Sequence, residues 1–355
     1  MKKYVCKYAG FCCGIGVEEG WEYVFQRFMN EYSFYYEFEE CLNMEECDAR
    51  IYIVRKAYEG AIESEEVCIH SSHSKNRKYL LNGEVYTQEN ASVYANIKKE
   101  NDLLYYYIKK VDVKVLAKLK EKSVYISGDN LYDMFSYVYE TLLSINIEHN
   151  GGIQFHGACC TWNNKGYLIT GKSGGGKTTL MFNILEKGGC FHSNDRVAIF
   201  KENDNYVAYS IPIPVNVPIN MMRTLDKWKN TELVRTAEDN TKVRFLVKEL
   251  SHMFGSKMIK KANVEDILVV NYSIDKPTYK CLSDKEIKDY VEVLSPHDEN
   301  HPKWLPLFDY PSEEVVGRGL EMMKEKIKIR GLYGNDIFKA LEESMSGDII
   351  WKKES

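Results

Sequence analysis

Proline is missing from the first 211 residues of the chain, because all eight prolines lie at or after Pro212. The turns of that long segment must therefore be made with Gly, Asn and Asp. No apolar run approaches the roughly 20 residues that cross a bilayer, so we expect no membrane span. Basic charge is not in excess either, since 47 Lys and Arg face 52 Asp and Glu, a net charge of −5. This balance argues against a general nucleic-acid-binding surface.

Cysteine pairs of the C-x-x-C type are also absent, although the chain has ten cysteines. The missing spacing disfavours a zinc site, including one built from Cys6, Cys12, Cys13, Cys41 and Cys47. We expect reduced thiols rather than a disulfide framework. Lys7 and then Glu18 and Glu19 interrupt any apolar signal segment after the basic start, so we expect a cytoplasmic protein.

A length of 355 residues is sufficient for two domains, or for one large domain with appendages, and a composition of 44% hydrophobic and 28% charged residues is typical of a folded protein. We expect an α/β protein of mixed α+β character. Its parts are a β-rich N-terminal domain that binds substrate or partner (1–125), a nucleotide-binding domain with a mixed sheet flanked by helices (126–312), and C-terminal helices packing on it (313–355).

Strand-like segments dominate the N-terminal part, at 50–54, 66–70 and 103–108. Tyr79–Tyr86 is predicted as a hairpin, because Asn82-Gly83 suits the positive φ angles of a type I′ turn. The apolar stripe over 130–148 predicts a helix.

The charged tail, with Lys324, Lys326, Lys328 and Arg330, is expected to form a solvated helix face.

The segment Gly171–Thr178, GKSGGGKT, matches the phosphate-binding pattern G-x-x-x-x-G-K-[ST] without a mismatch. Tyr167–Thr170 before it is short and apolar, as a buried strand is. Leu180–Leu185 after it carries apolar residues on one helical face, and Gly188-Gly189 ends that helix. Strand, loop and helix therefore occur in the order that a phosphate-binding loop requires.

Each residue type in the loop suits a phosphate. Glycines let the backbone N–H groups turn inward, and the helix start adds partial positive charge. Lys177 reaches the terminal phosphates, and the Thr178 hydroxyl holds Mg²⁺. The predicted site comprises Gly171, Lys172, Ser173, Gly174, Gly175, Gly176, Lys177, Thr178 and Thr179.

Two further residues lie near this motif in sequence. Asp195 follows Lys177 in the next strand region, where a carboxylate can face the Mg²⁺ held by Thr178. A turn aspartate paired with Arg196 is the alternative. His156 ends an apolar run in a hairpin that leads into the loop, and Gly157 after it leaves room for a ligand. This hairpin makes the expected sheet mixed rather than parallel.

Together, Phe155-His156-Gly157, Gly166–Thr178 and Ser193–Val197 resemble the catalytic domain of the HPr kinase/phosphorylase family, whose wider fold group includes the ATP-dependent phosphoenolpyruvate carboxykinases. The match covers about residues 153–200 and does not extend to the N-terminal 125. The chain looks more like the divergent HPr-kinase-like proteins, some of which phosphorylate a serine on a precursor peptide.

The resemblance implies ATP bound by the loop, Mg²⁺ held by Thr178 and Asp195, and His156 near the reacting groups. It also suggests a homo-oligomer. One position departs from the family, which has two consecutive aspartates and uses the first as the base. Asn194 stands there, and an amide is not a base at neutral pH. Either His156 or Asp195 then accepts the proton, or the loose transition state needs little help from a base.

Three functions remain open at this point. The first is an ATP-dependent kinase acting on a hydroxyl, expected to be serine, of a peptide or protein; the extra N-terminal residues favour such a partner. The second is a kinase for a small molecule such as free serine. The third is a non-catalytic ATP-binding module, which Asn194 favours.

Overall fold

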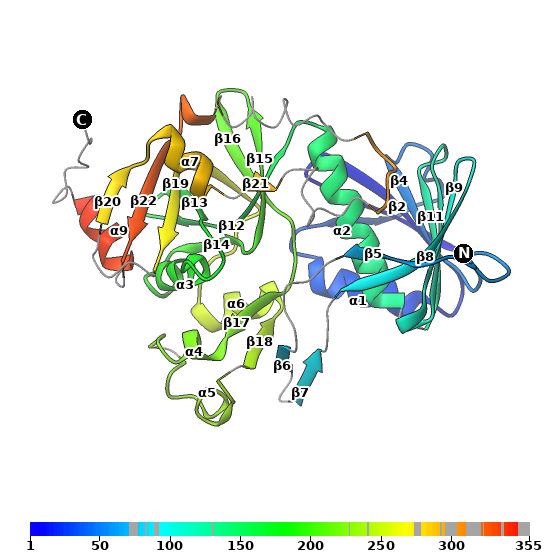
Figure 1. The fold of residues 1–355 in the computed structure, drawn as a ribbon, viewed down its shortest axis with the longest axis horizontal. Coiled ribbons are helices and arrows are strands. Elements are labelled where there is room, and N and C mark those ends of the chain that lie inside the picture. The colour runs from blue at the N-terminus through cyan, green and yellow to red at the C-terminus, as the bar shows by residue number, and fades with distance from the viewer. Residues whose placement is uncertain are drawn as a thin grey trace. The chain divides into compact units, whose positions relative to one another are not determined.

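The structure is a computed structural model of the 355-residue chain (Figure 1). The chain divides into two compact units. Unit 1 comprises Met1–Lys75, Glu89–Gly151 and Pro296–Ser312, and unit 2 comprises Asn76–Gln88, Gly152–Ser295 and Glu313–Ser355. The residues described are 1–70, 77–81, 84–88, 92–129, 131–226, 228–239, 241–272, 278–291, 293–294, 304–309, 321, 323–334 and 337–346.

The boundaries of these units differ from those of the three parts expected from the sequence, 1–125, 126–312 and 313–355. Helix α2 (Leu131–His149) belongs to unit 1, because it packs on α1 (Glu22–Tyr32) and on strands of the N-terminal sheet. The hairpin predicted at Tyr79–Tyr86 belongs instead to unit 2. Its strands pair in antiparallel register, with Leu81 opposite Glu84, while the turn itself lies outside the described residues.

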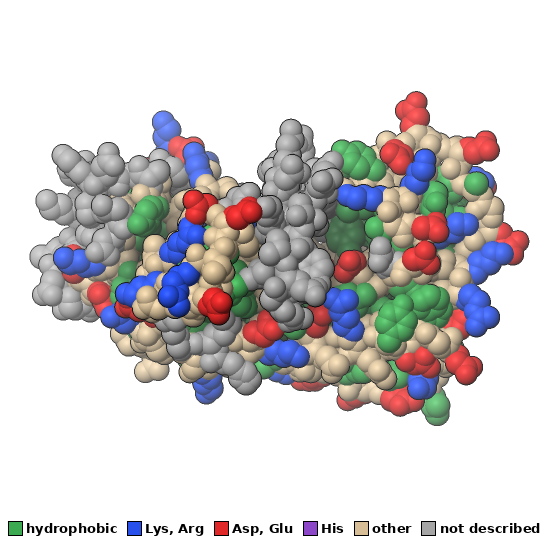
Figure 2. All heavy atoms as spheres, turned by 90° about the horizontal axis from the view of Figure 1, so that it is seen from below, with side chains coloured by type: hydrophobic (Ala, Val, Ile, Leu, Met, Phe, Trp, Pro, Cys, Tyr) green, Lys and Arg blue, Asp and Glu red, His purple; other side chains and the backbone are tan. Residues whose placement is uncertain are grey.

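Acidic and basic side chains are interspersed on the face of the molecule in Figure 2. This mixing agrees with the near balance of charge in the sequence. In the part of the chain that is described, no helix is both long enough and apolar enough to span a bilayer. All ten cysteines are free thiols.

Unit 1 is built on one sheet in the order β3-β1-β2-β4-β11-β10-β9-β8-β5. Most neighbours are antiparallel, whereas β2–β4 and β4–β11 are parallel. The strands are β1 (Lys2–Tyr8), β2 (Phe11–Val17), β3 (Glu37–Glu40), β4 (Ala49–Ile53), β5 (Glu66–His70), β8 (Val93–Glu100), β9 (Leu103–Ile108), β10 (Val113–Lys118) and β11 (Ser123–Gly128), with a 3-10 turn, η1 (Lys109–Val111), before β10.

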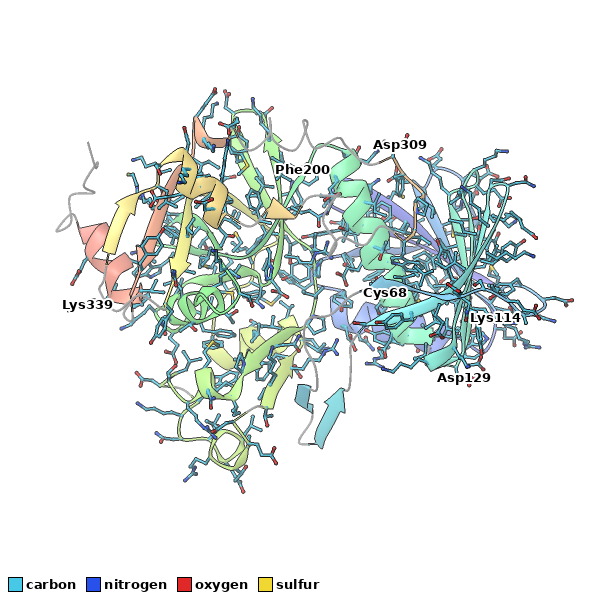
Figure 3. The ribbon with its side chains drawn as sticks, in the orientation of Figure 1. Cys68, Lys114, Asp129, Phe200, Asp309 and Lys339 are labelled. Carbon is cyan, nitrogen blue, oxygen red and sulfur yellow. The ribbon has the colours of Figure 1, made fainter. Side chains whose placement is uncertain are left out.

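Aromatic rings fill much of the space between the sheet of unit 1 and its helices. Phe28 on α1 stacks on Tyr36 and meets Tyr139 of α2 with ring centroids 5.0 Å apart. At the surface, Lys114 (labelled in Figure 3) places its ammonium 4.9 Å from the ring centroid of Tyr58. Tyr36, Tyr58 and Tyr139 therefore serve packing, as buried aromatic residues commonly do.

Unit 2 contains a mixed sheet in the order β13-β12-β15-β16-β19-β22-β20, with β14 and β21 also paired to β12. Strand β13 pairs with β19 as well, so β12, β13, β15, β16 and β19 form a closed circuit. The bounds are β12 (Ile153–Trp162), β13 (Lys165–Thr170), β14 (Cys190–Ser193), β15 (Arg196–Glu202), β16 (Asn205–Ser210), β19 (Lys261–Asn271), β20 (Thr278–Cys281), β21 (Val293–Leu294) and β22 (Lys328–Tyr333).

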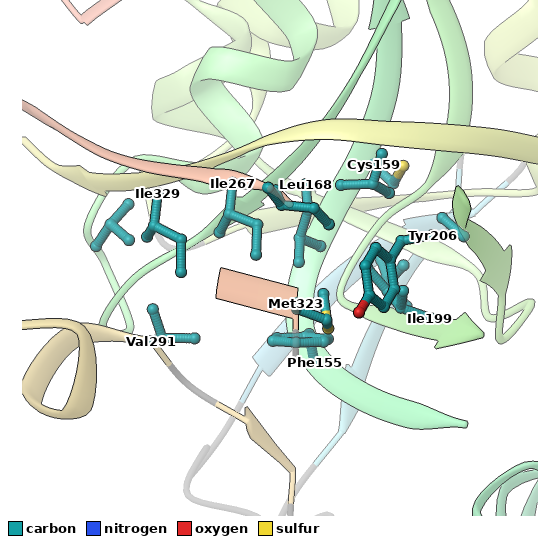
Figure 4. Close-up of a cluster of buried hydrophobic side chains, with 14 of the residues drawn as sticks. Phe155, Cys159, Leu168, Ile199, Tyr206, Ile267, Val291, Met323 and Ile329 are labelled. Atoms are coloured by element: carbon teal, nitrogen blue, oxygen red, sulfur yellow. The ribbon is translucent and has the colours of Figure 1, made fainter. Parts of the chain in front are cut away.

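The core of unit 2 lies against these strands (Figure 4). Phe155, Leu168 and Ile267 come from three different strands and are fully buried, and Met323 packs with them. Burying side chains of this size contributes about 1.5–3 kcal/mol each. The mixed α/β fold expected from the sequence is thus present, with parallel β13–β19 and antiparallel β12–β13 pairs in one sheet.

Helices and a small second sheet complete unit 2. The helices are α3 (Lys177–Glu186), α4 (Ile219–Met222), α5 (Glu232–Thr236), α6 (Val247–Phe254), α7 (Asp284–Tyr290) and α9 (Ile337–Ser346). The small sheet has the order β17-β18-β6-β7, with β6 (Arg77–Leu81), β7 (Glu84–Gln88), β17 (Val215–Pro218) and β18 (Thr241–Phe245).

The C-terminal tail is not purely helical, and the prediction of a solvated helix face there is wrong. Lys328–Tyr333 forms β22, which lies between β19 and β20 in the large sheet. Arg330 is largely buried and its guanidinium nitrogen lies 3.4 Å from the carboxylate of Asp266. Ile329, Gly331 and Leu332 are buried, so tertiary packing overrides the charge pattern.

Candidate functional site

The glycine-rich segment Gly171–Thr178 connects β13 to α3, as the sequence predicts. Gly171 has φ of 137°, and a Cβ there would overlap the carbonyl oxygen of Val270 on β19. Gly174 and Gly176 also have positive φ, a conformation that glycine adopts at little cost. The backbone N–H of Tyr272 donates to the carbonyl of Gly175 at 2.9 Å, which fixes the loop to the end of β19.

The start of α3 faces this loop. Lys177 is the first residue of the helix, and its ammonium donates to the carbonyls of Gly171 at 2.6 Å and Lys172 at 3.3 Å. The helix N-terminus carries unsatisfied N–H groups and the positive end of the helix dipole. Loop, lysine and helix start together form an arrangement that can hold an anion such as a phosphate chain.

Thr178, the next residue, faces the turn between β14 and β15. Its hydroxyl donates to the side-chain oxygen of Asn194, 3.4 Å away. Asn194 is 9% exposed, so its oxygen has a fixed position beside the loop. Two neutral oxygen ligands are thereby placed together, and oxygen is the ligand that a hard cation prefers.

Asp195 lies in the same turn but has a different partner. Nε2 of His156, on β12, lies 3.0 Å from Oδ1 of Asp195. The Asp195 carbonyl accepts a second bond from the N–H of Gly157 at 3.1 Å. Arg196, the alternative partner considered from sequence, donates to Gln154 at 2.8 Å, and its charge also acts on Asp195.

The conformation of Asp195 explains why it and Asn194 diverge. Its φ is 76°, in the left-handed region where aspartate and asparagine are tolerated better than most residues. Strands β14 and β15 both pair with β12, with His156 opposite Arg196 and Cys159 opposite Ser193. The turn between them is therefore held against His156.

The pKa of Asp195 lies below its usual value. Desolvation by the surrounding protein acts to raise the pKa, but the hydrogen bond from His156 and the charges of His156, Lys177 and Arg196 outweigh it. The carboxylate is therefore ionised throughout the neutral range.

One interpretation made from the sequence needs correction. Gly157 does not leave room for a ligand, because a Cβ there would lie 2.6 Å from the carbonyl oxygen of Ile169 on β13. The glycine is required by the close approach of the two strands.

The structure thus brings the predicted loop, His156 and Asp195 together around β12 and β13. The contact between Asn194 and Thr178 was not predicted from the sequence. It depends on the conformation of the turn, which directs the side chains of Asn194 and Asp195 to different partners. Sequence reasoning also missed a cavity of about 340 Å³ beside the loop, lined by residues that include Gly176, Thr179, Asn183, Tyr272, Ile337 and Phe338. Gly176, Thr179 and Asn183 lie in or just after the predicted loop, but Tyr272, Ile337 and Phe338 are far from it in the sequence and belong to no motif.

Across the described residues, no group of three or more His, Cys, Asp and Glu side chains is placed to hold a metal ion. Thr178 and Asn194 offer a hydroxyl oxygen and an amide oxygen instead. A cation that needs few protein ligands can therefore be held between the loop and the turn.

No protein-family model and no curated protein matches the chain. Among solved structures, the Hpr(Ser) kinase/phosphatase from Coxiella burnetii matches with 11% identity and a TM-score of 0.27. The match covers 55% of this chain and 95% of that chain. A TM-score this low does not by itself establish a common fold.

Proposed function

We propose that this chain is an ATP-dependent kinase that transfers the γ-phosphate to a hydroxyl, that of a serine, on a peptide or protein. The observation that carries the proposal is one arrangement in unit 2. A complete GKSGGGKT loop joins β13 to α3, with Lys177 and Thr178 at the helix start, and His156 on the adjacent strand β12 is paired with Asp195 in the turn between β14 and β15.

In this proposal the loop binds the triphosphate. Backbone N–H groups of Gly174, Gly176 and Lys177 and the dipole of α3 attract the phosphate oxygens, while the N–H of Gly175 donates to the Lys172 carbonyl at 2.9 Å. Lys177 exchanges its bonds to the Gly171 and Lys172 carbonyls for the terminal phosphates. Neutralising their charge favours the transfer.

The residues present fit Mg²⁺. Thr178 and Asn194 offer oxygens 3.4 Å apart, and the Asp195 carboxylate belongs to the same turn. Mg²⁺ commonly binds one or two protein ligands and completes its shell with water and substrate phosphates. The lack of a three-carboxylate cluster among the described residues therefore agrees with such a site. When bound, the ion would neutralise charge on the transferring phosphoryl group.

The His156–Asp195 pair takes the acceptor proton. The hydroxyl oxygen forms a bond to the γ-phosphorus while the bond from that phosphorus to the bridging oxygen breaks, releasing ADP. The hydroxyl proton passes to the pair, which shares one hydrogen bond of 3.0 Å. Because phosphoryl transfer is loose, positioning and charge neutralisation supply most of the rate and a modest base suffices.

Unit 1 is the proposed binding region for the peptide or protein acceptor. Its support is its size, since it holds a nine-stranded sheet and two helices that a small acceptor would not require.

The test is incubation of the full chain with ATP, Mg²⁺ and candidate serine-containing peptides and proteins, with free serine as a further acceptor. Mass spectrometry then detects addition of a phosphoryl group. Lys177→Ala is expected to abolish transfer, whereas Lys187→Ala, at the exposed far end of α3, is expected to retain it. Transfer by Lys177→Ala at the native rate would contradict the proposal. Transfer to free serine alone would replace the peptide acceptor with a small molecule.

A further inference from the structure

A cavity of about 340 Å³ adjoins the glycine-rich loop within unit 2. This volume falls in the range of small-molecule pockets, about 300–1,000 Å³. Thr179 and Asn183 line it from α3, Tyr272 from the end of β19, and Ile337 and Phe338 from the start of α9.

The cavity is continuous with the loop. Gly174 and Gly176 line it, and a Cβ on Gly176 would lie 3.3 Å from Cδ1 of Ile337 and 3.4 Å from Cβ of Tyr272. A molecule whose phosphates sit on the loop is therefore directly beside the cavity.

Consecutive helical residues divide the two regions. Thr178 faces Asn194, while Thr179 lines the cavity. Residues one apart on an α-helix do not face the same direction. The proposed cation position, beside Thr178, and the cavity thus lie on different faces of the first turn of α3. This agrees with a nucleotide, whose phosphates and base lie at opposite ends of the molecule.

The cavity walls combine flat apolar groups with hydrogen-bonding groups. The ring of Phe338 lies 5.4 Å, centroid to centroid, from that of Trp162, so its position is supported from behind. The side chain of Tyr272 is 48% exposed, while its backbone is bonded to Gly175. Aromatic faces of this kind stack on nucleobases.

Asn183 supplies the means of telling one base from another. A carboxamide both donates and accepts, which matches the adjacent N6 donor and N7 acceptor of adenine. Guanine presents acceptors at both of those positions.

We propose that this cavity binds the base of the nucleotide and selects adenine, with Tyr272 and Phe338 as stacking surfaces and Asn183 as the specificity-determining residue. The inference rests on the proposed function and deepens it by assigning the base site.

The test is calorimetric titration of the full chain, in Mg²⁺, with ATP, GTP and tripolyphosphate. Tyr272→Ala removes a half-exposed ring and keeps the backbone bond to Gly175, so the fold is expected to survive. Tyr23→Ala, which removes a ring 54% exposed in unit 1, is the matched control.

Tyr272→Ala is expected to weaken ATP binding about tenfold and to change tripolyphosphate binding less than about twofold. Asn183→Leu is expected to reduce the preference for ATP over GTP by about tenfold. Tyr23→Ala should change neither.

Unchanged ATP binding by Tyr272→Ala, or an equal loss of ATP and tripolyphosphate, would overturn the base site. If Lys177→Ala still abolishes binding in that case, the loop keeps its proposed role. Failure of the unmodified chain to bind ATP, GTP or tripolyphosphate would overturn the proposed function itself, and the base site with it.

Discussion

The side-chain oxygen of Asn194 lies 3.4 Å from the hydroxyl oxygen of Thr178, while the carboxylate of the next residue, Asp195, is bonded to His156. Two consecutive residues thus belong to two different parts of the site. The surroundings of Asn194 make it a neighbour of the proposed cation rather than of the proposed acceptor. We therefore expect the amide at this position to weaken cation binding more than proton transfer.

Asn194→Asp should strengthen Mg²⁺ binding, because it places a carboxylate beside Thr178 at an almost fully buried position. We expect the Mg²⁺ concentration for half-maximal ATP binding to fall about tenfold, since hydrogen bonds and ligands that carry charge are the stronger ones. Titration of ATP binding against Mg²⁺ measures this. An unchanged Mg²⁺ dependence with a faster transfer rate at saturating Mg²⁺ would show that residue 194 acts as a base.

His156→Gln should slow transfer about 10²–10⁴-fold, the usual contribution of a positioned acid or base. It should also move the acid limb of the pH–rate profile to higher pH. The hydrogen bond and the charge of His156 both help to hold the pKa of Asp195 below its usual value, and glutamine, which can still donate but carries no charge, lets that pKa rise. Rates from pH 3 to pH 8 test both effects. A fall in rate with the acid limb unchanged would contradict the expected effect of His156 on the pKa of Asp195. His149→Gln, on an exposed helix end, is the control.

His192 should make unit 2 less stable as the solution is acidified. Burial lowers the pKa of His192 to about 4 from 6.5, so the unfolded chain binds the proton first. Stability is fully present above pH 6.5 and declines as the pH falls towards 4, by about 3 kcal/mol in total. Chemical denaturation across this range should show the decline. His192→Asn keeps a donor for the Ile259 carbonyl, which lies 2.9 Å from Nδ1, and should make stability less dependent on pH. An equally steep decline in that variant would mean that a group other than His192 causes the loss of stability.

Gly171→Ala should unfold or strongly destabilise unit 2, because its Cβ meets the Val270 carbonyl and its φ is 137°. We expect a loss of about 3 kcal/mol or more. Gly188→Ala is the matched variant, since Gly188 has φ of 84° but open space around its Cβ position. Strain alone should cost it about 1 kcal/mol. Equal losses in the two variants would mean that the contact with β19 contributes nothing.

Local signals explain what was predictable from the sequence. β13, the loop and α3 were predicted because glycines, an apolar strand and an amphipathic helix follow one another without interruption. β5 and α2 were predicted from periodicity and composition. The roles of the loop residues, His156 and Asp195 remain predictions until transfer is measured.

Long-range pairing explains what was not predictable. β22 was missed because Lys328 and Arg330 made the segment look like a charged surface helix. It is a strand because it pairs with β19 and β20 on its two sides. The cavity was missed because it joins α3 to α9 and the end of β19. The different partners of Asn194 and Asp195 follow from a left-handed φ that the sequence does not specify.

The closed circuit of strands bears on the thermodynamics of ligand binding. β13 is hydrogen-bonded on one side to β12 and on the other to β19, and the loop that follows it is tied to Tyr272. Such a loop is preorganised, and little conformational entropy is left to lose when a ligand arrives. Affinity at this position then reflects charge and shape rather than induced ordering, and the association rate is not slowed by a prior rearrangement of the backbone.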